Sequence, residues 1–394
     1  MVAEIKSVRK VGARLLAFLS LAWLAACDVA LPGAVGDAGA RAVAPGAPIQ
    51  VALLVPGGGS QTDALLARDL ENAARLAASE LQGAEVEIRV YNTAGDAGRA
   101  AAVARQAVAD GAQIILGPLY AEAANAVGVA VAPQGVTVLS FSNNTTIAGG
   151  NVFVLGPTFE NTANRLASYT RGQGISNFFI AHSNDLQGGL GRAAIENAVS
   201  RAGGRVVGIE AYALSQEGLL AAGPTIAARS RAAGADAIFT TAGAGDEVAF
   251  LASVIADAGG LQGGVPLIGL TRWDAAPQSL ATPGLQGGYF ALPDQAVQAA
   301  FEARYRAAYG SAPHPLAGLA YDGVAMIGAL AASGRRDPLS RSALTTGSGF
   351  QGTSGVFRLR GDGTNERGLA VARVIDGRVQ IVDPAPRGFG GAGF

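Results

Sequence analysis

The stretch that decides the fold is IQVALLVPGGGSQTDALLARDLENAARLAASEL, residues 49–81. It opens with an almost unbroken apolar run rich in valine and leucine, which is typical of a strand buried on both faces. After a glycine turn, apolar residues recur at helical spacing, as Leu66, Leu70, Ala73 and Ala77. A buried strand that leads directly into an amphipathic helix is the repeating unit of a parallel α/β sheet.

The same alternation continues along the chain. Strand patterns separated by helical patterns occur at 86–92, 113–118, 136–142 and 152–156, and a second series follows at 176–183, 205–212, 236–242, 266–271 and 287–292. Within the second series, Pro224 is expected to interrupt the helix predicted over 215–234. After residue 293 two helical patterns come in succession, and then short strands with glycine turns at 361–363 and 376–377, which predict hairpins.

This order predicts an α/β protein of two lobes, each a doubly wound and mainly parallel sheet, with a chain that crosses between the lobes more than once. We assign residues 48–157 and 293–340 to lobe 1, and residues 158–292 and 341–383 to lobe 2. The glycine-rich end of the chain, residues 384–394, predicts a disordered tail.

The N-terminus has the pattern of an export signal. Basic residues precede an apolar run over 15–26, which is too short to cross a bilayer as a helix and predicts a signal peptide over 1–26. The run ends in Leu-Ala-Ala-Cys, which resembles a bacterial lipobox and implies that Cys27 is lipidated. The alternative is an incidental cysteine beside an ordinary cleavage site. We expect a flexible linker over 27–47 and a lipid-anchored periplasmic protein, at either the inner or the outer membrane.

Composition excludes several classes of function. The chain has two lysines, Lys6 and Lys10, and one cysteine, so a mature chain would carry no lysine and no internal thiol nucleophile. Its two histidines, His182 and His314, do not form a zinc motif, and no basic patch favours nucleic acid. We therefore expect no catalytic residues, no metal and no cofactor.

Residues 189–194 imitate a dinucleotide-binding fingerprint, with an acidic residue at position 210. The glycines lie several residues beyond the predicted strand, however, whereas the fingerprint needs them in the turn itself. They favour the start of a helix.

Polar residues gather where the predicted strands end. In an open parallel sheet, ligands bind at the carboxyl ends of the strands, where loops offer free backbone N–H groups. The candidate ligand-binding residues are therefore Ser60, Gln61, Thr62, Tyr120, Ser140, Phe141, Ser142 and Asn143 in lobe 1, and Asp185, Gln187, Thr241, Arg272, Trp273 and Asp274 in lobe 2. Ser, Asn and Thr are also ordinary helix caps and turn residues, and this structural explanation stays open for each of them.

The ordered set of motifs resembles the leucine/isoleucine/valine-binding proteins. The resemblance rests on residues 49–59, on residues 91–144 with their Ile-Leu-Gly-Pro segment, on residues 176–199 and on residues 316–330. It covers about residues 49–383 and implies the type 1 periplasmic-binding fold. It further implies a small amino-acid-like ligand and the permease of an ATP-binding-cassette importer as partner.

The chain departs from those amino-acid binders at the ligand positions. The turn over 119–122 lacks the serine that would hold a ligand carboxylate, and Arg272 is expected to oppose Asp274 as a partner for a ligand amine. The ending over 350–386 resembles penicillin-binding-protein activators, which implies a non-catalytic lipoprotein that contacts a peptidoglycan synthase. Two hypotheses therefore stand: a regulator of this activator type and, as the alternative, the solute-binding subunit of an importer.

Overall fold

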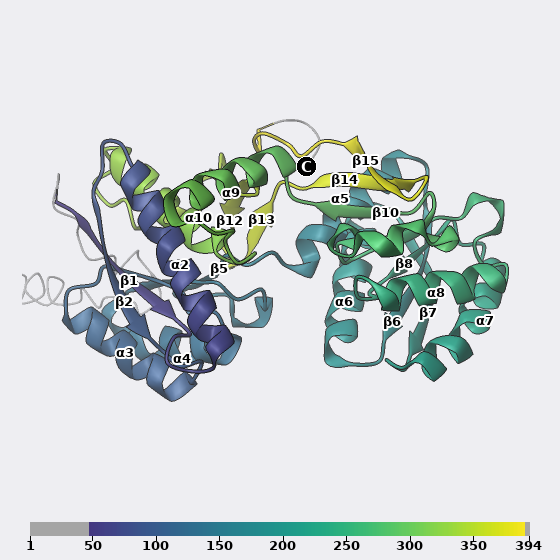
Figure 1. Cartoon of the computed structure of the whole chain (residues 1–394), viewed down its shortest axis with the longest axis horizontal. Helices are drawn as coiled ribbons and strands as arrows, with labels where there is room; N and C mark the ends of the chain where they lie inside the picture. The colour runs from purple at the N-terminus through teal and green to yellow at the C-terminus, as the bar shows by residue number, and fades with distance from the viewer. Residues whose placement is uncertain (1–46, 391–394) are drawn as a thin grey trace, which may run out of the picture. The chain divides into compact units, whose positions relative to one another are not determined.

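The computed structural model describes residues 47–390, so the predicted signal peptide, Cys27 and most of the linker lie outside the described residues. Lobe 1 is built on a parallel sheet of order β2-β1-β3-β4-β5 (Figure 1). Its strands are β1 (Ile49–Val55), β2 (Val86–Asn92), β3 (Ile114–Leu116), β4 (Thr137–Ser140) and β5 (Val152–Val154). Its main helices are α2 (Gln61–Glu80), α3 (Ala97–Ala109), α4 (Ala121–Val131), α9 (Gln295–Tyr309) and α10 (Gly318–Ala332).

The apolar run that opens the fold is buried from both sides, as predicted. Leu53 packs in a core shared with helices α2, α9 and α10, whereas its neighbour Leu54 packs in a second core with α3 and α4. Successive residues of a strand point to opposite faces, so a strand between two helical layers must be apolar at nearly every position. The predicted apolar face of α2 is confirmed, since its leucines and alanines at helical spacing are buried.

Lobe 2 holds a larger sheet of order β15-β14-β10-β9-β8-β6-β7. The five strands β6 to β10 pair in parallel, whereas β14 and β15 join the sheet by antiparallel pairing. Its strands are β6 (Asn177–Ser183), β7 (Arg205–Tyr212), β8 (Ala237–Thr240), β9 (Leu267–Gly269), β10 (Tyr289–Leu292), β14 (Ala370–Ile375) and β15 (Arg378–Asp383). Its main helices are α5 (Phe159–Gly172), α6 (Leu186–Arg201), α7 (Gln216–Ala232) and α8 (Asp246–Asp257). The turn of the β14–β15 hairpin falls at the predicted Asp-Gly.

The expected interruption at Pro224 is wrong, because α7 runs through the proline without a break. The residue before the proline is Gly223, which has no Cβ to clash with the proline ring. A side chain at Gly223 would also meet Val254 of α8 at 2.7 Å, so the two helices pack closely at this point. Packing therefore maintains a helix whose local sequence argues for a break.

The predicted boundary at residue 340 is also wrong. Helix α11 (Arg341–Leu344) and a three-stranded antiparallel sheet of β11 (Phe350–Gly352), β12 (Gly355–Leu359) and β13 (Asn365–Arg367) follow α10. Leu344, Phe357 and Leu359 from this segment are buried in the core of lobe 1. The chain therefore returns to lobe 2 after β13, because the apolar faces of these short strands are covered by lobe 1.

The prediction of a disordered tail needs correction for residues 384–390. Phe389 is buried, and its ring lies 4.5 Å from the guanidinium of Arg358. The backbone carbonyl of Arg387 accepts a hydrogen bond from Gln351. Burial of this one aromatic side chain is enough to order the segment despite its glycine-rich composition. Residues 391–394 lie outside the described part of the chain.

A buried polar network joins the segments that cross between the lobes. Arg367 donates to the carbonyl of Leu155 in the first crossing, at 2.6 Å, and pairs with Asp322 of α10 at 3.2 Å. Asn365 donates to the carbonyls on both sides of Leu155, and Asn161 of α5 bonds both to Asn365 and to the backbone N–H of Arg367. We call these residues, Asn161, Asp322, Asn365 and Arg367, the joint.

No helix in the described range 47–390 is long and apolar enough to span a membrane.

We predict that Asp322→Ala destabilises the folded protein by about 3–5 kcal/mol, because it leaves the buried Arg367 guanidinium without its counter-charge. Urea unfolding followed by circular dichroism measures the loss. Glu366→Ala is the matched control, because Glu366 is the neighbour of Arg367 in β13 but pairs with Arg358 in a more exposed ion pair. Its loss should lower the free energy of unfolding by about 0–1 kcal/mol. Equal losses in the two variants would contradict this role of Asp322.

Candidate functional site

The carboxyl edge of the lobe 1 sheet carries a bonded trio of side chains. Ser60 is the N-cap of α2 and forms a capping box with Asp63. Tyr120, the N-cap residue of α4, donates its hydroxyl to Asp63 at 2.5 Å, although 42% of Tyr120 is exposed. The bond from Tyr120 is the main cause that lowers the pKa of Asp63 below its ordinary value, and it raises the pKa of Tyr120. Asp63 is therefore ionised at neutral pH, and its charge occupies the N-terminus of α2.

The serines of the predicted loop after β4 are tied to the backbone. Ser140 is buried and donates to the carbonyl of Pro118 at 3.0 Å, while Ser142 accepts from the N–H of Asn144 at 3.1 Å. Phe141 is buried in the lobe 1 core, so its prediction as a ligand contact is corrected. Asn143, by contrast, is exposed.

Two further polar side chains of lobe 1, Gln61 and Thr62, occupy the first turn of α2 and are exposed. They stand beside Ser60 at the same sheet edge, because helix α2 begins where strand β1 ends. The residues that lobe 1 offers most openly are therefore Gln61, Thr62, Asn143 and the face of Tyr120.

In lobe 2 the corresponding edge is organised by the N-terminus of α6. Asp185 caps this helix, accepting from the N–H of Gly188 at 2.7 Å and from the hydroxyl of Ser183 at 2.8 Å. These bonds lower the pKa of Asp185, the one from Gly188 most. Thr241 accepts from the backbone N–H of Ser183, and Gln187 is exposed.

Gly191 of the apparent dinucleotide fingerprint and its neighbour Gly188 have a structural purpose. A Cβ on Gly188 would stand 2.0 Å from the carbonyl of Ser183, and one on Gly191 would stand 2.8 Å from Thr241 and from Leu270. Gly188, Gly189 and Gly191 all lie inside α6 rather than in the turn after β6. Gly188 and Gly191 let the helix approach the sheet, and the glycines lie at the start of a helix, as the alternative explanation predicted.

The segment after β9 contains the opposition between Arg272 and Asp274 that the sequence indicated. Arg272 and Asp274 bind each other through two hydrogen bonds, of 3.1 and 2.6 Å, so the arginine neutralises the carboxylate rather than leaving it for a ligand amine. Trp273 is fully buried against Phe290 in the lobe 2 core, and its prediction as a ligand contact is corrected. Its indole lies over Gly269 and Gly288, where side chains would leave no room for the ring.

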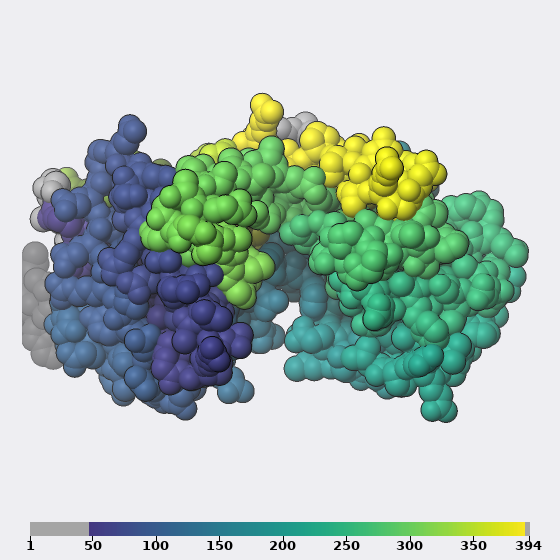
Figure 2. All heavy atoms as spheres, viewed as in Figure 1, coloured from purple at the N-terminus to yellow at the C-terminus, as the bar shows by residue number. Residues whose placement is uncertain are grey.

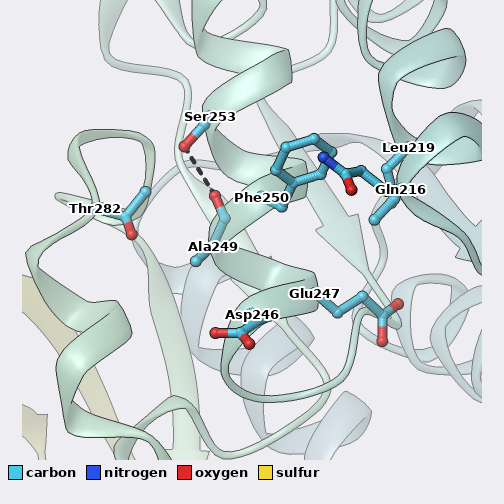
Figure 3. Close-up of a pocket in the computed structure, with 8 residues that line it drawn as sticks. All are labelled: Gln216, Leu219, Asp246, Glu247, Ala249, Phe250, Ser253 and Thr282. Carbon is cyan, nitrogen blue, oxygen red and sulfur yellow. Dashed lines mark hydrogen bonds between the residues drawn. The ribbon is translucent and has the colours of Figure 1, made fainter.

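Sequence reasoning missed a hollow of about 500 Å³ within lobe 2. It lies between the first turns of α7 and α8, lined by Gln216, Leu219, Asp246, Glu247, Ala249, Phe250, Ser253 and Thr282 (Figure 3). Glu247 accepts from the hydroxyl of Tyr212 at 2.9 Å and from the N–H of Gly243 at 2.9 Å, and these bonds fix the orientation of its side chain. None of the predicted ligand residues lines the hollow, and no sequence motif marked it.

The edges of both sheets offer hydrogen-bonding groups. Among residues 47–390 no group of three or more His, Cys, Asp or Glu side chains could hold a metal ion. His182 bonds to the carbonyl of Ser183, and His314 accepts from the N–H of Leu316. Both histidines thus have local backbone partners.

The comparisons with known proteins agree with this architecture. The model of a family described as periplasmic binding protein matches residues 48–378. No curated protein matches the chain.

Three similar solved structures come from bacterial transport systems. One is a putative branched-chain amino acid ABC transporter from Rhodospirillum rubrum, with a TM-score of 0.71 and 20% identity over 85% of this chain and 100% of the other. Another is a branched-chain amino acid ABC transporter periplasmic ligand-binding protein from Burkholderia xenovorans, with a TM-score of 0.65 and 18% identity over 86% and 96%. The third is an ABC transporter substrate-binding protein from Desulfitobacterium hafniense in complex with Leu, with a TM-score of 0.58 and 21% identity over 85% and 100%.

We predict that Tyr120→Phe raises the pKa of Asp63 toward its ordinary value of 3.8, because it removes the hydroxyl donor that most favours the charged carboxylate. Because the pKa of Asp63 is lower in the folded than in the unfolded chain, its carboxylate stabilises the fold at any pH above the unfolded-state pKa. This contribution is lost as the pH falls through the folded-state pKa. The variant should therefore be less stable than the parent chain at neutral pH, and the difference should shrink below about pH 4. NMR titration of the Asp63 carboxyl measures the shift.

Tyr91→Phe is the matched control for this prediction, since Tyr91 donates in the same way to Asp110. The control should leave the titration of Asp63 unchanged. An Asp63 pKa that Tyr120→Phe does not move would show that the hydroxyl has no part in setting it.

Proposed function

This chain belongs to the periplasmic binding protein family, and on that premise we propose that it is the solute-binding subunit of an ATP-binding-cassette importer. The predicted type 1 fold, with two lobes of mainly parallel sheet, is confirmed. The observation that carries the proposal is that each lobe presents exposed polar side chains at the carboxyl edge of its sheet. Parallel sheets bind small ligands at that edge.

The comparisons favour the importer over the activator hypothesis, because the similar solved structures are those of transporter proteins. The structure also gives the activator-like ending another purpose. Strands β11–β13 complete the core of lobe 1, Asn365 and Arg367 belong to the joint, and β14 and β15 extend the sheet of lobe 2. The pattern on which that resemblance rested is therefore explained by the fold itself, and we do not propose a peptidoglycan synthase as partner.

In this proposal a small amino-acid-like solute binds between the exposed groups of the two edges. Gln61, Thr62 and Asn143 offer amide and hydroxyl groups in lobe 1, and Gln187 offers an amide in lobe 2. Movement of the lobes about their crossing segments closes on the solute. The side chains hold and orient the solute without changing it, and the importer permease is the protein partner.

The first experiment is a thermal-shift screen of the purified protein with amino acids, their amides and amines, and aromatic carboxylates. A solute that binds only the folded state and is present at a concentration of 100 times its dissociation constant stabilises that state by about 2.7 kcal/mol. A true ligand therefore raises the melting temperature. We expect at least one solute of this size to do so. A screen in which none stabilises the protein at saturating concentrations would contradict the proposed function.

The second experiment tests the residues with the solute found in that screen. Asn143→Ala and Gln187→Ala should each weaken its binding by about tenfold or less, the range expected for one hydrogen bond, in isothermal titration. Gln173→Ala is the matched control, an exposed amide at the end of α5, which lies at the opposite edge of the lobe 2 sheet. If Asn143→Ala and Gln187→Ala both left the affinity unchanged, the solute would bind elsewhere, for example in the hollow between α7 and α8.

We also propose that the protein is held at a bacterial membrane by lipid on Cys27, a residue outside the described range. The apolar run before a single cysteine supports this. Cys27→Ser should move the exported protein from the membrane fraction to the soluble periplasmic fraction, as measured by immunoblotting of separated fractions. A variant that stays with the membrane to the same extent as the parent chain would contradict the anchor.

A further inference from the structure

The end of the described chain leaves lobe 2 and returns to lobe 1. Residues 384–390 begin where β15 ends, and Ala385 packs against the lobe 2 core beneath β14 and β15. The carbonyl of Pro384 accepts a weak hydrogen bond, of 3.4 Å, from Arg165 of α5. The start of this segment is thus fixed to lobe 2.

The other end of the segment is fixed to the three-stranded sheet that completes lobe 1. The ring of Phe389 lies against Gly349, where a Cβ would stand 2.8 Å from it, and beneath the guanidinium of Arg358. Arg358 is itself held by two hydrogen bonds, of 2.9 and 2.7 Å, to Glu366. The ring therefore occupies a prepared position rather than a bare surface.

Between its two ends the segment passes over the crossing from β13 to β14. A Cβ on Gly368, in that crossing, would stand 3.0 Å from the ring of Pro386. Gln351 of β11 donates to the carbonyl of Arg387 at 3.1 Å. Figure 2 shows the C-terminal part of the described chain, β14 and β15 included, in yellow on the molecular surface.

We propose that residues 384–390 act as a strap, a further connection between the lobes that limits how far they move apart. From Ala385 to Phe389 an extended chain reaches at most about 14 Å. The place where Ala385 packs on the lobe 2 core and the position of Phe389 therefore cannot separate farther than this unless the ring leaves its place under Arg358. Loss of that buried aromatic contact opposes wide opening.

The strap does not depend on the proposed function. None of the contacts described above involves the proposed solute-binding residues Gln61, Thr62, Asn143 and Gln187. The strap therefore acts on the lobes with or without a solute. The experiment that tests it is accordingly carried out without any ligand, and its failure would leave the solute-binding proposal untouched.

The test measures the distance between the lobes in the full-length chain. Arg105→Cys in α3 and Ala228→Cys in α7 place spin labels at exposed positions of lobe 1 and lobe 2, and Cys27→Ser removes the single native thiol. Pulsed electron spin resonance then gives the distribution of distances. Three changes are compared on this background: Phe389→Ala, removal of residues 384–394, and removal of residues 391–394 alone as the matched control.

We expect Phe389→Ala and the long truncation to broaden the distribution toward longer distances, and the short truncation to leave it unchanged. Hydrogen exchange provides a second readout, in which the amide of Gly368 loses protection when Phe389 is replaced. Distributions that coincide for the parent chain, Phe389→Ala and the long truncation would overturn the strap. A distribution that narrows would overturn it equally, and if the long truncation fails to fold, Phe389→Ala alone decides.

Discussion

The constraint on which the structure depends is that the central strands are buried on both faces. In β1 the side chains of Leu53 and Leu54 enter different cores, one on each side of the sheet. Such a strand has no face left for polar groups, so helices must cover both sides and the polar residues are confined to the edges. The confinement of the candidate ligand residues to the carboxyl edges follows from this packing.

Where the chain crosses between the lobes, buried polar groups hold the crossing segments together. The joint buries the charged pair Arg367–Asp322 together with Asn365 and Asn161, and it directs their hydrogen bonds at backbone carbonyls of the crossing chain. Buried charges are costly unless they are paired, and their directional bonds favour one geometry over others. A joint of this kind fixes how the segments pass one another, a result that a nonspecific apolar contact would not achieve.

At the candidate site the polar residues divide into two groups. Ser60, Ser140, Ser142, Asp185 and Thr241 are bonded within the protein and build the loops, although Ser60 and Asp185 are also exposed. The second group, Gln61, Thr62, Asn143 and Gln187, is exposed throughout. The first group shapes the edge and the second is free to meet a solute. Asp63 adds a fixed negative charge, and Arg272 and Asp274 cancel each other.

The sequence by itself determined the order of strands and helices, the presence of two α/β units and the loops that end them, because burial on both faces leaves a continuous apolar pattern and helices leave their own period. It did not determine the route of the helix through Pro224, the side of the joint on which residues 341–367 pack, or the place of Phe389. Nor did it separate the buried Phe141 and Trp273 from the exposed Asn143 and Gln187. Those outcomes depend on which surfaces meet, and only the tertiary structure brings together residues as distant in the chain as Leu155, Asp322 and Arg367.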